Sequence, residues 1–242
     1  MFKKPLPFFY KIIFVLTIIL FFEIILIYKS YSKYENIKTK DLGIQNINKK
    51  KPMVIIVDIT TNTLSVFQEG NLIKTYRCAG GKQATPSPIG TWKVINKDTW
   101  GAGFGGRWMG LNVPWGKYGI HGTLYPNSIG WNSSQGCIRM KNEDVAELYE
   151  YVPLGTNVII WGGPFGAFGE YLRSIKPGMT GSDVYALQQI LKEKGYFKGY
   201  INGIYGEDLR YAIHKYQKDN KMPISDEINM NFYNRLGIYL ID

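Results

Sequence analysis

A histidine and a cysteine, His121 and Cys137, carry the clearest chemical signal in this chain of 242 residues, which holds only two residues of each type. They lie in the segment GIHGTLYPNSIGWNSSQGCIRM, residues 119–140. A cysteine attacks as its thiolate, and because a thiol has an ordinary pKa of about 8.5, it needs a neighbouring base or positive charge near neutral pH. We therefore expect Cys137 to be a nucleophile and His121 to be its general base and acid.

Glycines flank both of these residues. Gly122 and Gly136 allow the backbone to turn sharply and to approach a substrate closely. Backbone N–H groups around Gly136 and Cys137 can bind the oxyanion of a tetrahedral intermediate, which is usually the largest contribution to acyl-transfer catalysis. The pattern predicts a cysteine-dependent hydrolase or acyltransferase.

The same segment resembles a known family. The motifs H-G-T and S-x-G-C-I-R-M are similar to those of the L,D-transpeptidase catalytic domain, also called YkuD-like. Further similarity lies upstream, in Gly80-Gly81, in TPSPIGTW at residues 85–92 and in RWMGL at residues 107–111. The resemblance covers about residues 52–163 and implies a mainly β catalytic domain, a β-sandwich or barrel with a short helix.

In that family a peptidoglycan stem tetrapeptide acylates the cysteine, D-alanine leaves, and an amine of a neighbouring stem takes the acyl group. The resemblance implies that Cys137 is the nucleophile, His121 its base, and the Gly122 carbonyl the group that orients the imidazole. It also implies Gly136 as a backbone oxyanion donor. Four residues are expected to contact substrate: Arg139, Ser134, Trp108 and Tyr118. Many members have a second histidine before the Gly-Cys pair, and here Gln135 replaces it.

The second cysteine and the second histidine have simpler interpretations. Cys78 lies in a strand-like run at residues 76–79, where a lone thiol usually acts as a small buried hydrophobe, although a disulfide with Cys137 is an alternative in an exported chain. His214 follows a helical pattern and is expected on a helix surface. The cysteines and histidines lack the spacing of metal ligands, so no metal or other cofactor is expected.

The N-terminus predicts a membrane anchor. Residues 6–28 read LPFFYKIIFVLTIILFFEIILIY, which approaches the ~20 apolar residues that cross a bilayer, with Lys11 and Glu23 as interruptions. No small-residue cleavage site follows, so residues 1–28 are interpreted as a cytoplasmic stub and an uncleaved transmembrane helix. A buried helix of a soluble protein is the alternative. Lysines on both sides leave the orientation open, and the resemblance implies a single-pass protein with its catalytic domain outside the cell membrane, acting in the cell wall.

The formal net charge of +10 is concentrated near this anchor. Residues 1–52 hold ten lysines against three acidic residues, whereas the later parts are nearly neutral. A nucleic-acid partner is therefore not expected, because such binders carry a basic face on a folded module. Residues 29–51 are interpreted as an extracytoplasmic linker, whose lysines either contact anionic lipids or acidic wall polymers or are simply solvated.

Periodicity then predicts the elements of residues 52–163. Strands are expected at five segments: residues 53–59, 63–68, 72–79, 91–97 and 156–162. Glu69-Gly70-Asn71 marks a hairpin turn, and a helix is expected from Asn142 to Val152 with Asn142 as its N-cap. The glycine-aromatic loop at residues 99–106 is either a lid over the cysteine or an ordinary connection.

After a linker at residues 164–171, a second unit is expected over residues 172–242. Its pattern, GMTGSDVYALQQIL followed by GY, NGIYG and AIHKYQ, resembles the small three-helix peptidoglycan-binding domain. Ser182 is expected to cap its first helix and Gly195 to end it. Its aromatic residues Tyr196, Phe197, Tyr200 and Tyr205 are either core or sugar-stacking residues, and core is the preferred interpretation for most.

Together these expectations describe a membrane-anchored L,D-transpeptidase that joins the third residues of two stem peptides (a 3-3 cross-link) and that carbapenems acylate. Its expected partners are peptidoglycan stem peptides and glycan. One alternative keeps the chemistry but gives the acyl group to water, as a carboxypeptidase does, or to another amine. A non-catalytic wall-tethering protein is the other alternative.

Overall fold

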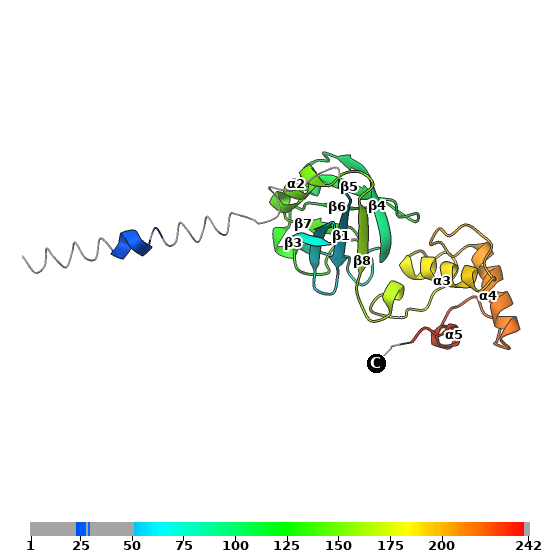
Figure 1. Cartoon of the computed structure of the whole chain (residues 1–242). Helices are drawn as coiled ribbons and strands as arrows, with labels where there is room; N and C mark the ends of the chain where they lie inside the picture. The colour runs from blue at the N-terminus through cyan, green and yellow to red at the C-terminus, as the bar shows by residue number, and fades with distance from the viewer. Residues whose placement is uncertain (1–22, 28, 30–50, 240–242) are drawn as a thin grey trace, which may run out of the picture. The chain divides into compact units, whose positions relative to one another are not determined.

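The computed structural model describes residues 23–27, 29 and 51–239 (Figure 1). The chain divides into two units, residues 1–46 and 47–242. Among the described residues, no helix is both long enough and apolar enough to cross a membrane. Most of the predicted transmembrane segment, residues 6–28, and most of the predicted linker, residues 29–51, lie outside the described residues, so both stay predictions.

Residues 53–161 form a closed β-barrel, which confirms the mainly β prediction (Figure 1). The strand order around the barrel is β1-β2-β3-β7-β6-β5-β4-β8. Closure leaves no unpaired sheet edge. The strands are β1 (Met53–Asp58), β2 (Thr63–Gln68), β3 (Asn71–Ala79), β4 (Gly90–Asp98), β5 (Trp108–Leu111), β6 (Tyr118–His121), β7 (Ile138–Met140) and β8 (Asn157–Trp161).

The long strands follow the alternation of the sequence. In β1 and β2 every second side chain enters the core, among them Ile55, Val57 and Leu64, none of which is exposed. The predicted hairpin turn is confirmed between β2 and β3, where Glu69 and Gly70 both have positive φ, 52° and 80°. Such a turn matches the right-handed twist of the strands that it joins.

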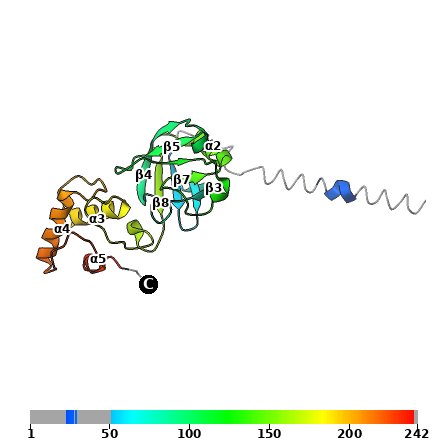
Figure 2. The same ribbon diagram turned by 180° about the vertical axis from the view of Figure 1, so that it is seen from behind.

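The helix α2 (Asn142–Tyr151) packs Val145, Leu148 and Tyr151 into the barrel core and contacts β6 (Figure 2). Its predicted N-cap is wrong: the cap is Lys141, which makes no side-chain capping bond. The predicted cap residue is instead the first residue of the helix, and its side chain bonds to a neighbouring loop.

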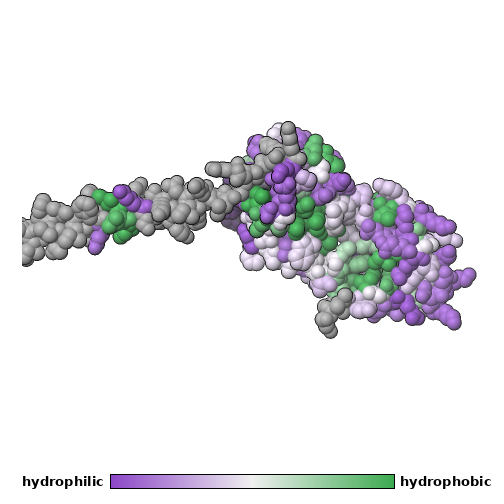
Figure 3. All heavy atoms as spheres, in the orientation of Figure 1, coloured by the Kyte–Doolittle hydropathy of each residue, from purple (hydrophilic) through white to green (hydrophobic). Residues whose placement is uncertain are grey.

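The C-terminal residues form several helices: η4 (Gly166–Phe168), α3 (Ser182–Glu193), α4 (Glu207–Asp219) and α5 (Met230–Leu236). Buried side chains such as Leu187, Ile213 and Phe232 form a separate core for this helical module. Hydrophilic side chains gather over α4 on the face drawn in Figure 3. The N-cap of α3 is Gly181 rather than the predicted Ser182, whereas Gly195 follows the last turn with a φ of 81°, as a helix-ending glycine does.

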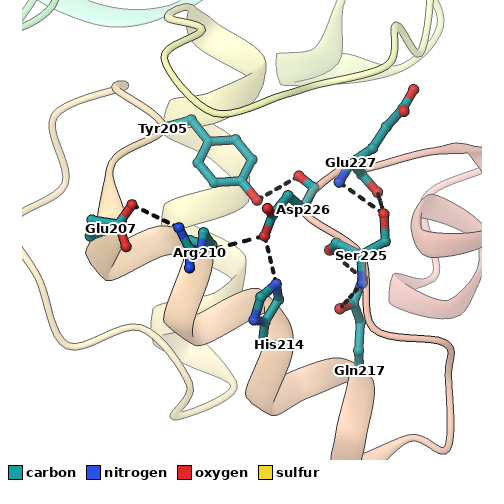
Figure 4. A network of polar contacts seen from close by, with 8 residues as sticks. All are labelled: Tyr205, Glu207, Arg210, His214, Gln217, Ser225, Asp226 and Glu227. Atoms are coloured by element: carbon teal, nitrogen blue, oxygen red, sulfur yellow. Dashed lines mark hydrogen bonds and ion pairs between the residues drawn. The ribbon is translucent and has the colours of Figure 1, made fainter.

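A polar network ties α4 to residues 225–227 (Figure 4). The His214 Nε2 lies 2.7 Å from Asp226 Oδ1, and the Arg210 Nε lies 3.5 Å from the same oxygen. The Tyr205 hydroxyl donates to the Asp226 carbonyl at 2.7 Å. His214 therefore lies on a helix as expected, but it has an acidic partner that approaches from a later segment.

Candidate active site

The register of three short strands places the predicted catalytic residues on one face of the sheet. Trp108 of β5 pairs with His121 of β6, and His121 pairs with Arg139 of β7. Their neighbours in the strands face the core and are not exposed at all: Met109, Ile120 and Ile138. Since side chains alternate along a strand, His121 and Arg139 share the face that points away from the core. Cys137 lies immediately before β7, two residues from Arg139.

A backbone carbonyl fixes the tautomer of His121. The Nδ1 of this imidazole lies 2.6 Å from the Gly122 carbonyl oxygen, the contact that the family resemblance implies. A carbonyl oxygen can only accept a hydrogen bond, so Nδ1 carries the proton and Nε2 keeps its lone pair. The side chain is held in the orientation that a general base needs.

Two residues that the sequence analysis missed hold this carbonyl in place. The Gly122 N–H donates to the Phe104 carbonyl at 3.0 Å, and the Thr123 N–H donates to Asn142 Oδ1 at 2.8 Å. A Cβ added at Gly122 would lie 2.4 Å from the same oxygen. The absence of a side chain at Gly122 therefore lets Asn142 reach the backbone. The sequence shows this glycine next to the histidine, but only the fold shows that Asn142 needs the space.

The glycine-aromatic loop lies against the histidine. It contains the short helix η2 (Ala102–Phe104), and the Phe104 ring meets the His121 ring edge-on at 4.9 Å between centroids. Trp108 also stacks on His121 at 5.7 Å, and Trp100 stacks on Trp108 at 4.4 Å. Trp108 is only 4% exposed, as is His121, because Trp100 and Phe104 pack against it, and its contact with substrate stays a prediction.

Burial sets the protonation state of the imidazole. Desolvation, assisted by the positive charge of Arg139, lowers the pKa of His121 to about 4, although the bond to the Gly122 carbonyl opposes the shift. His121 is therefore neutral at neutral pH, with Nε2 available to accept a proton.

The two cysteines differ in their surroundings. Burial raises the pKa of the Cys137 thiol, while a backbone contact with Gly119 and the charge of Arg139 act in the opposite direction. The resting site thus pairs a neutral thiol with a neutral imidazole. Cys78 has no exposed surface, and burial raises its thiol pKa to about 12, which confirms its interpretation as a buried hydrophobe. Both thiols are free, so the disulfide alternative is wrong.

A tight turn presents Cys137. The Ser134 hydroxyl donates to the Cys137 carbonyl at 2.6 Å and accepts from the Gly136 N–H at 3.0 Å. The Gly136 N–H is engaged by this hydroxyl and is not a free oxyanion donor in this structure, which corrects the role expected of it. Ser134 has no exposed surface and supports the turn, and its contact with substrate stays a prediction.

The remaining two predicted substrate residues, Arg139 and Tyr118, are half-buried. Arg139 makes no hydrogen bond or ion pair within residues 51–239, so its guanidinium is available to an anionic group beside the thiol. The Tyr118 ring packs against the turn, since a Cβ added at Gly136 would lie 2.7 Å from its Cε1 atom. Burial raises the pKa of Tyr118, so its phenol stays protonated at neutral pH.

We expect Gly136→Ala to lower the free energy of unfolding by about 2–3 kcal/mol and to reduce activity, because Gly136 has a φ of 108° and its added Cβ would also meet the Pro86 carbonyl at 3.2 Å. Chemical denaturation measures the loss. Gly70→Ala is the matched control, since Gly70 has a positive φ with no atom within 4 Å of its added Cβ. Equal losses for the two variants would contradict the claimed crowding.

Comparisons with known proteins identify two domain families in this chain. The L,D-transpeptidase catalytic domain (YkuD) matches residues 52–160, and a family described as "Putative peptidoglycan binding domain" matches residues 180–236. A Bacillus licheniformis protein described as "Putative L,D-transpeptidase YkuD" is 44% identical over 110 residues, which are 45% of this chain and 66% of that protein. A Bacillus subtilis protein described as "Putative L,D-transpeptidase YqjB" is 34% identical over 122 residues, which are 44% of this chain and 69% of that protein.

A solved structure, "L,D-transpeptidase from Mycobacterium smegmatis", also matches, at 22% identity and a TM-score of 0.40, over 46% of this chain and 58% of that chain. The chain thus spans just under two thirds of the length of the Bacillus licheniformis relative and slightly more than two thirds of YqjB. On its sequence relatives and on the matched domain, this chain belongs to the YkuD family of L,D-transpeptidases, with a peptidoglycan-binding domain after the catalytic domain.

Proposed function

We propose that this protein is an active L,D-transpeptidase that joins the third residues of two peptidoglycan stems through an acyl-enzyme on Cys137. One observation carries the proposal: a neutral His121, with its Nδ1 proton held by a carbonyl, lies on β6 next to β7, and the residue just before β7 is Cys137, the only cysteine within residues 51–239 that is not fully buried. A general base with a free Nε2 beside a protonated thiol is the arrangement that nucleophilic catalysis requires.

In the first half-reaction the Cys137 sulfur attacks the carbonyl that links the third residue of the donor stem to its terminal D-alanine. The thiol proton passes to Nε2 of His121 as the carbon–sulfur bond forms. The resulting imidazolium then donates this proton to the departing amine, so D-alanine leaves as a neutral amine and a thioester remains on the enzyme.

In the second half-reaction an amine of a neighbouring stem attacks the thioester. His121, neutral again, accepts the proton that this amine loses, and Cys137 leaves as the thiol after the proton returns to sulfur. The new amide replaces the thioester, so no cofactor or external energy source is required. The oxyanion of each intermediate needs a backbone donor, and because Gly136 N–H is engaged, we assign this role to the amide of Cys137.

Arg139 has no ionic partner among residues 51–239, and its positive charge acts on the Cys137 thiol, so it suits an acidic substrate. Arg139 lies opposite His121 in the sheet, and stem peptides carry carboxylates, including that of the terminal D-alanine. We assign Arg139 to binding such a carboxylate and Tyr118 to lining the same pocket. The helical module holds the enzyme on peptidoglycan, and residues 6–28 anchor it in the cell membrane with the catalytic domain outside.

The decisive experiment incubates the full chain with purified disaccharide-tetrapeptide and follows the products by mass spectrometry. Loss of D-alanine together with a cross-linked dimer is the expected result. Loss of D-alanine with only tripeptide monomer would assign the acyl group to water, making the protein a carboxypeptidase. No reaction would favour a wall-tethering protein without catalytic activity.

A further inference from the structure

The helical module contains a cavity of about 280 Å³ formed entirely by residues 188–209. We propose that this cavity binds one N-acetylated sugar unit of a glycan strand, with the Tyr200 ring as the surface on which the sugar stacks. The inference rests on the proposed function only in taking peptidoglycan as the polymer, and it assigns the glycan contact to named residues.

Hydrogen bonds within the module hold the wall of the cavity in place without a ligand. Gln188 of α3 is only 2% exposed, and its amide nitrogen donates to Asn202 Oδ1 and to the Ile204 carbonyl, both at 3.0 Å. Its oxygen accepts from the backbone N–H of Asn202 at 3.0 Å and of Gly203 at 2.8 Å. Four hydrogen bonds from one buried side chain fix the loop at residues 202–204, so a ligand loses little affinity to ordering it.

An exposed aromatic ring, that of Tyr200, also lines the cavity. Phe197 and Leu209, at 3% and 1% exposure, belong to the module core, whereas Tyr200 lines the same cavity with 80% of its surface exposed. Tyr200 makes no hydrogen bond or ring contact with other described residues. The C–H groups on one face of a pyranose are weakly positive and the face of an aromatic ring is negative, so a tyrosine in this position suits a sugar ring.

Two polar groups in the cavity lack partners among the described residues. The Asn202 oxygen is used twice within the loop, by Gln188 and by the Ile204 N–H at 2.9 Å, which leaves its Nδ2 donor free. The Asp208 carboxylate makes no hydrogen bond or ion pair with the described residues. An acetamido group presents one carbonyl acceptor and one N–H donor, so this donor and this carboxylate complement it.

Size and charge favour a sugar over a stem peptide. Small-molecule sites usually measure about 300–1,000 Å³, so this cavity suits a single unit of a polymer. Glu207 also lines it, and although Arg210 pairs with this residue at 3.1 Å, the rim carries more negative than positive charge. The free carboxylates of a stem peptide would be repelled there, whereas a neutral sugar would not.

Isothermal titration calorimetry of the full chain with chitotetraose, an N-acetylglucosamine tetramer without peptide, tests the proposal. Tyr200→Ala should weaken binding by roughly threefold to tenfold, while Tyr200→Phe should bind as the wild type does, because stacking needs the ring and not the hydroxyl. Tyr211→Ala is the matched control, since Tyr211 is 73% exposed on α4 but does not line the cavity. It should leave binding unchanged.

Equal binding by the Tyr200→Ala and Tyr211→Ala variants would overturn the assignment, as would the absence of any binding to chitotetraose. Binding to a free stem peptide alone, weakened by salt, would also overturn it and would assign the cavity to peptide instead. Release of D-alanine from the soluble disaccharide-tetrapeptide should be the same in all three variants. This second measurement separates failure of the sugar site from failure of the transpeptidase reaction.

Discussion

Replacing Cys137 by alanine should lower transpeptidation by at least about 10³-fold, because no other group in the site can form the thioester. The variant should neither release D-alanine nor form a dimer in the mass-spectrometric assay. We also expect a carbapenem to acylate the wild-type enzyme, as the family resemblance implies, and the variant should lack the resulting mass increase. Intact mass spectrometry after incubation with a carbapenem measures this adduct without depending on which acceptor the enzyme prefers.

Cys78→Ala provides the control for this experiment. Cys78 is the other free thiol, but it has no exposed surface and a pKa raised to about 12, so it should form no adduct. Its replacement should reduce the free energy of unfolding by about 1–2 kcal/mol and leave the reaction intact. An adduct that persists in Cys137→Ala and disappears in Cys78→Ala would reverse the assignment of the nucleophile.

The long strands and the helices could be predicted because each carries a repeating apolar pattern. The hairpin after β2 was equally clear, since Glu69-Gly70-Asn71 supplies turn residues between two alternating runs. The three strands that carry the site were not predicted. β5, β6 and β7 are only three or four residues long, too short for an alternation to stand out, and they form because the barrel closes around them.

The residues of the site also fall into predictable and unpredictable groups. Residue type and spacing indicated Cys137 and His121, because their chemistry is local to each side chain. The burial of Trp108 and Ser134 could not be predicted, because an exposed side chain and a buried one beside the site look alike in a sequence. Asn142 was assigned to a helix cap, whereas its side chain binds a loop nineteen residues upstream. Such contacts depend on the fold.

His121→Gln should lower kcat/KM by about 10²–10⁴-fold, since glutamine cannot accept the thiol proton or return it to the leaving amine.

The pH dependence of wild-type activity gives a second test of His121 as the base. An imidazole that already carries a proton on Nε2 cannot act as the base, so activity falls as the pH drops through the pKa of His121. That pKa is lowered to about 4, and the acid limb of kcat/KM should therefore lie near pH 4 rather than near the ordinary value of about 6.5.

Arg139→Gln tests the electrostatic part of this argument. The Arg139 charge contributes to the lowered pKa of His121, so its removal should move the acid limb toward higher pH, whatever the variant does to the overall rate. Circular dichroism at each pH checks that the protein stays folded across the range. A wild-type acid limb near pH 6.5 would mean that the imidazole is solvated in the working enzyme. The glycine-aromatic loop at residues 99–106, which packs Phe104 against His121, would then have to open before substrate binds.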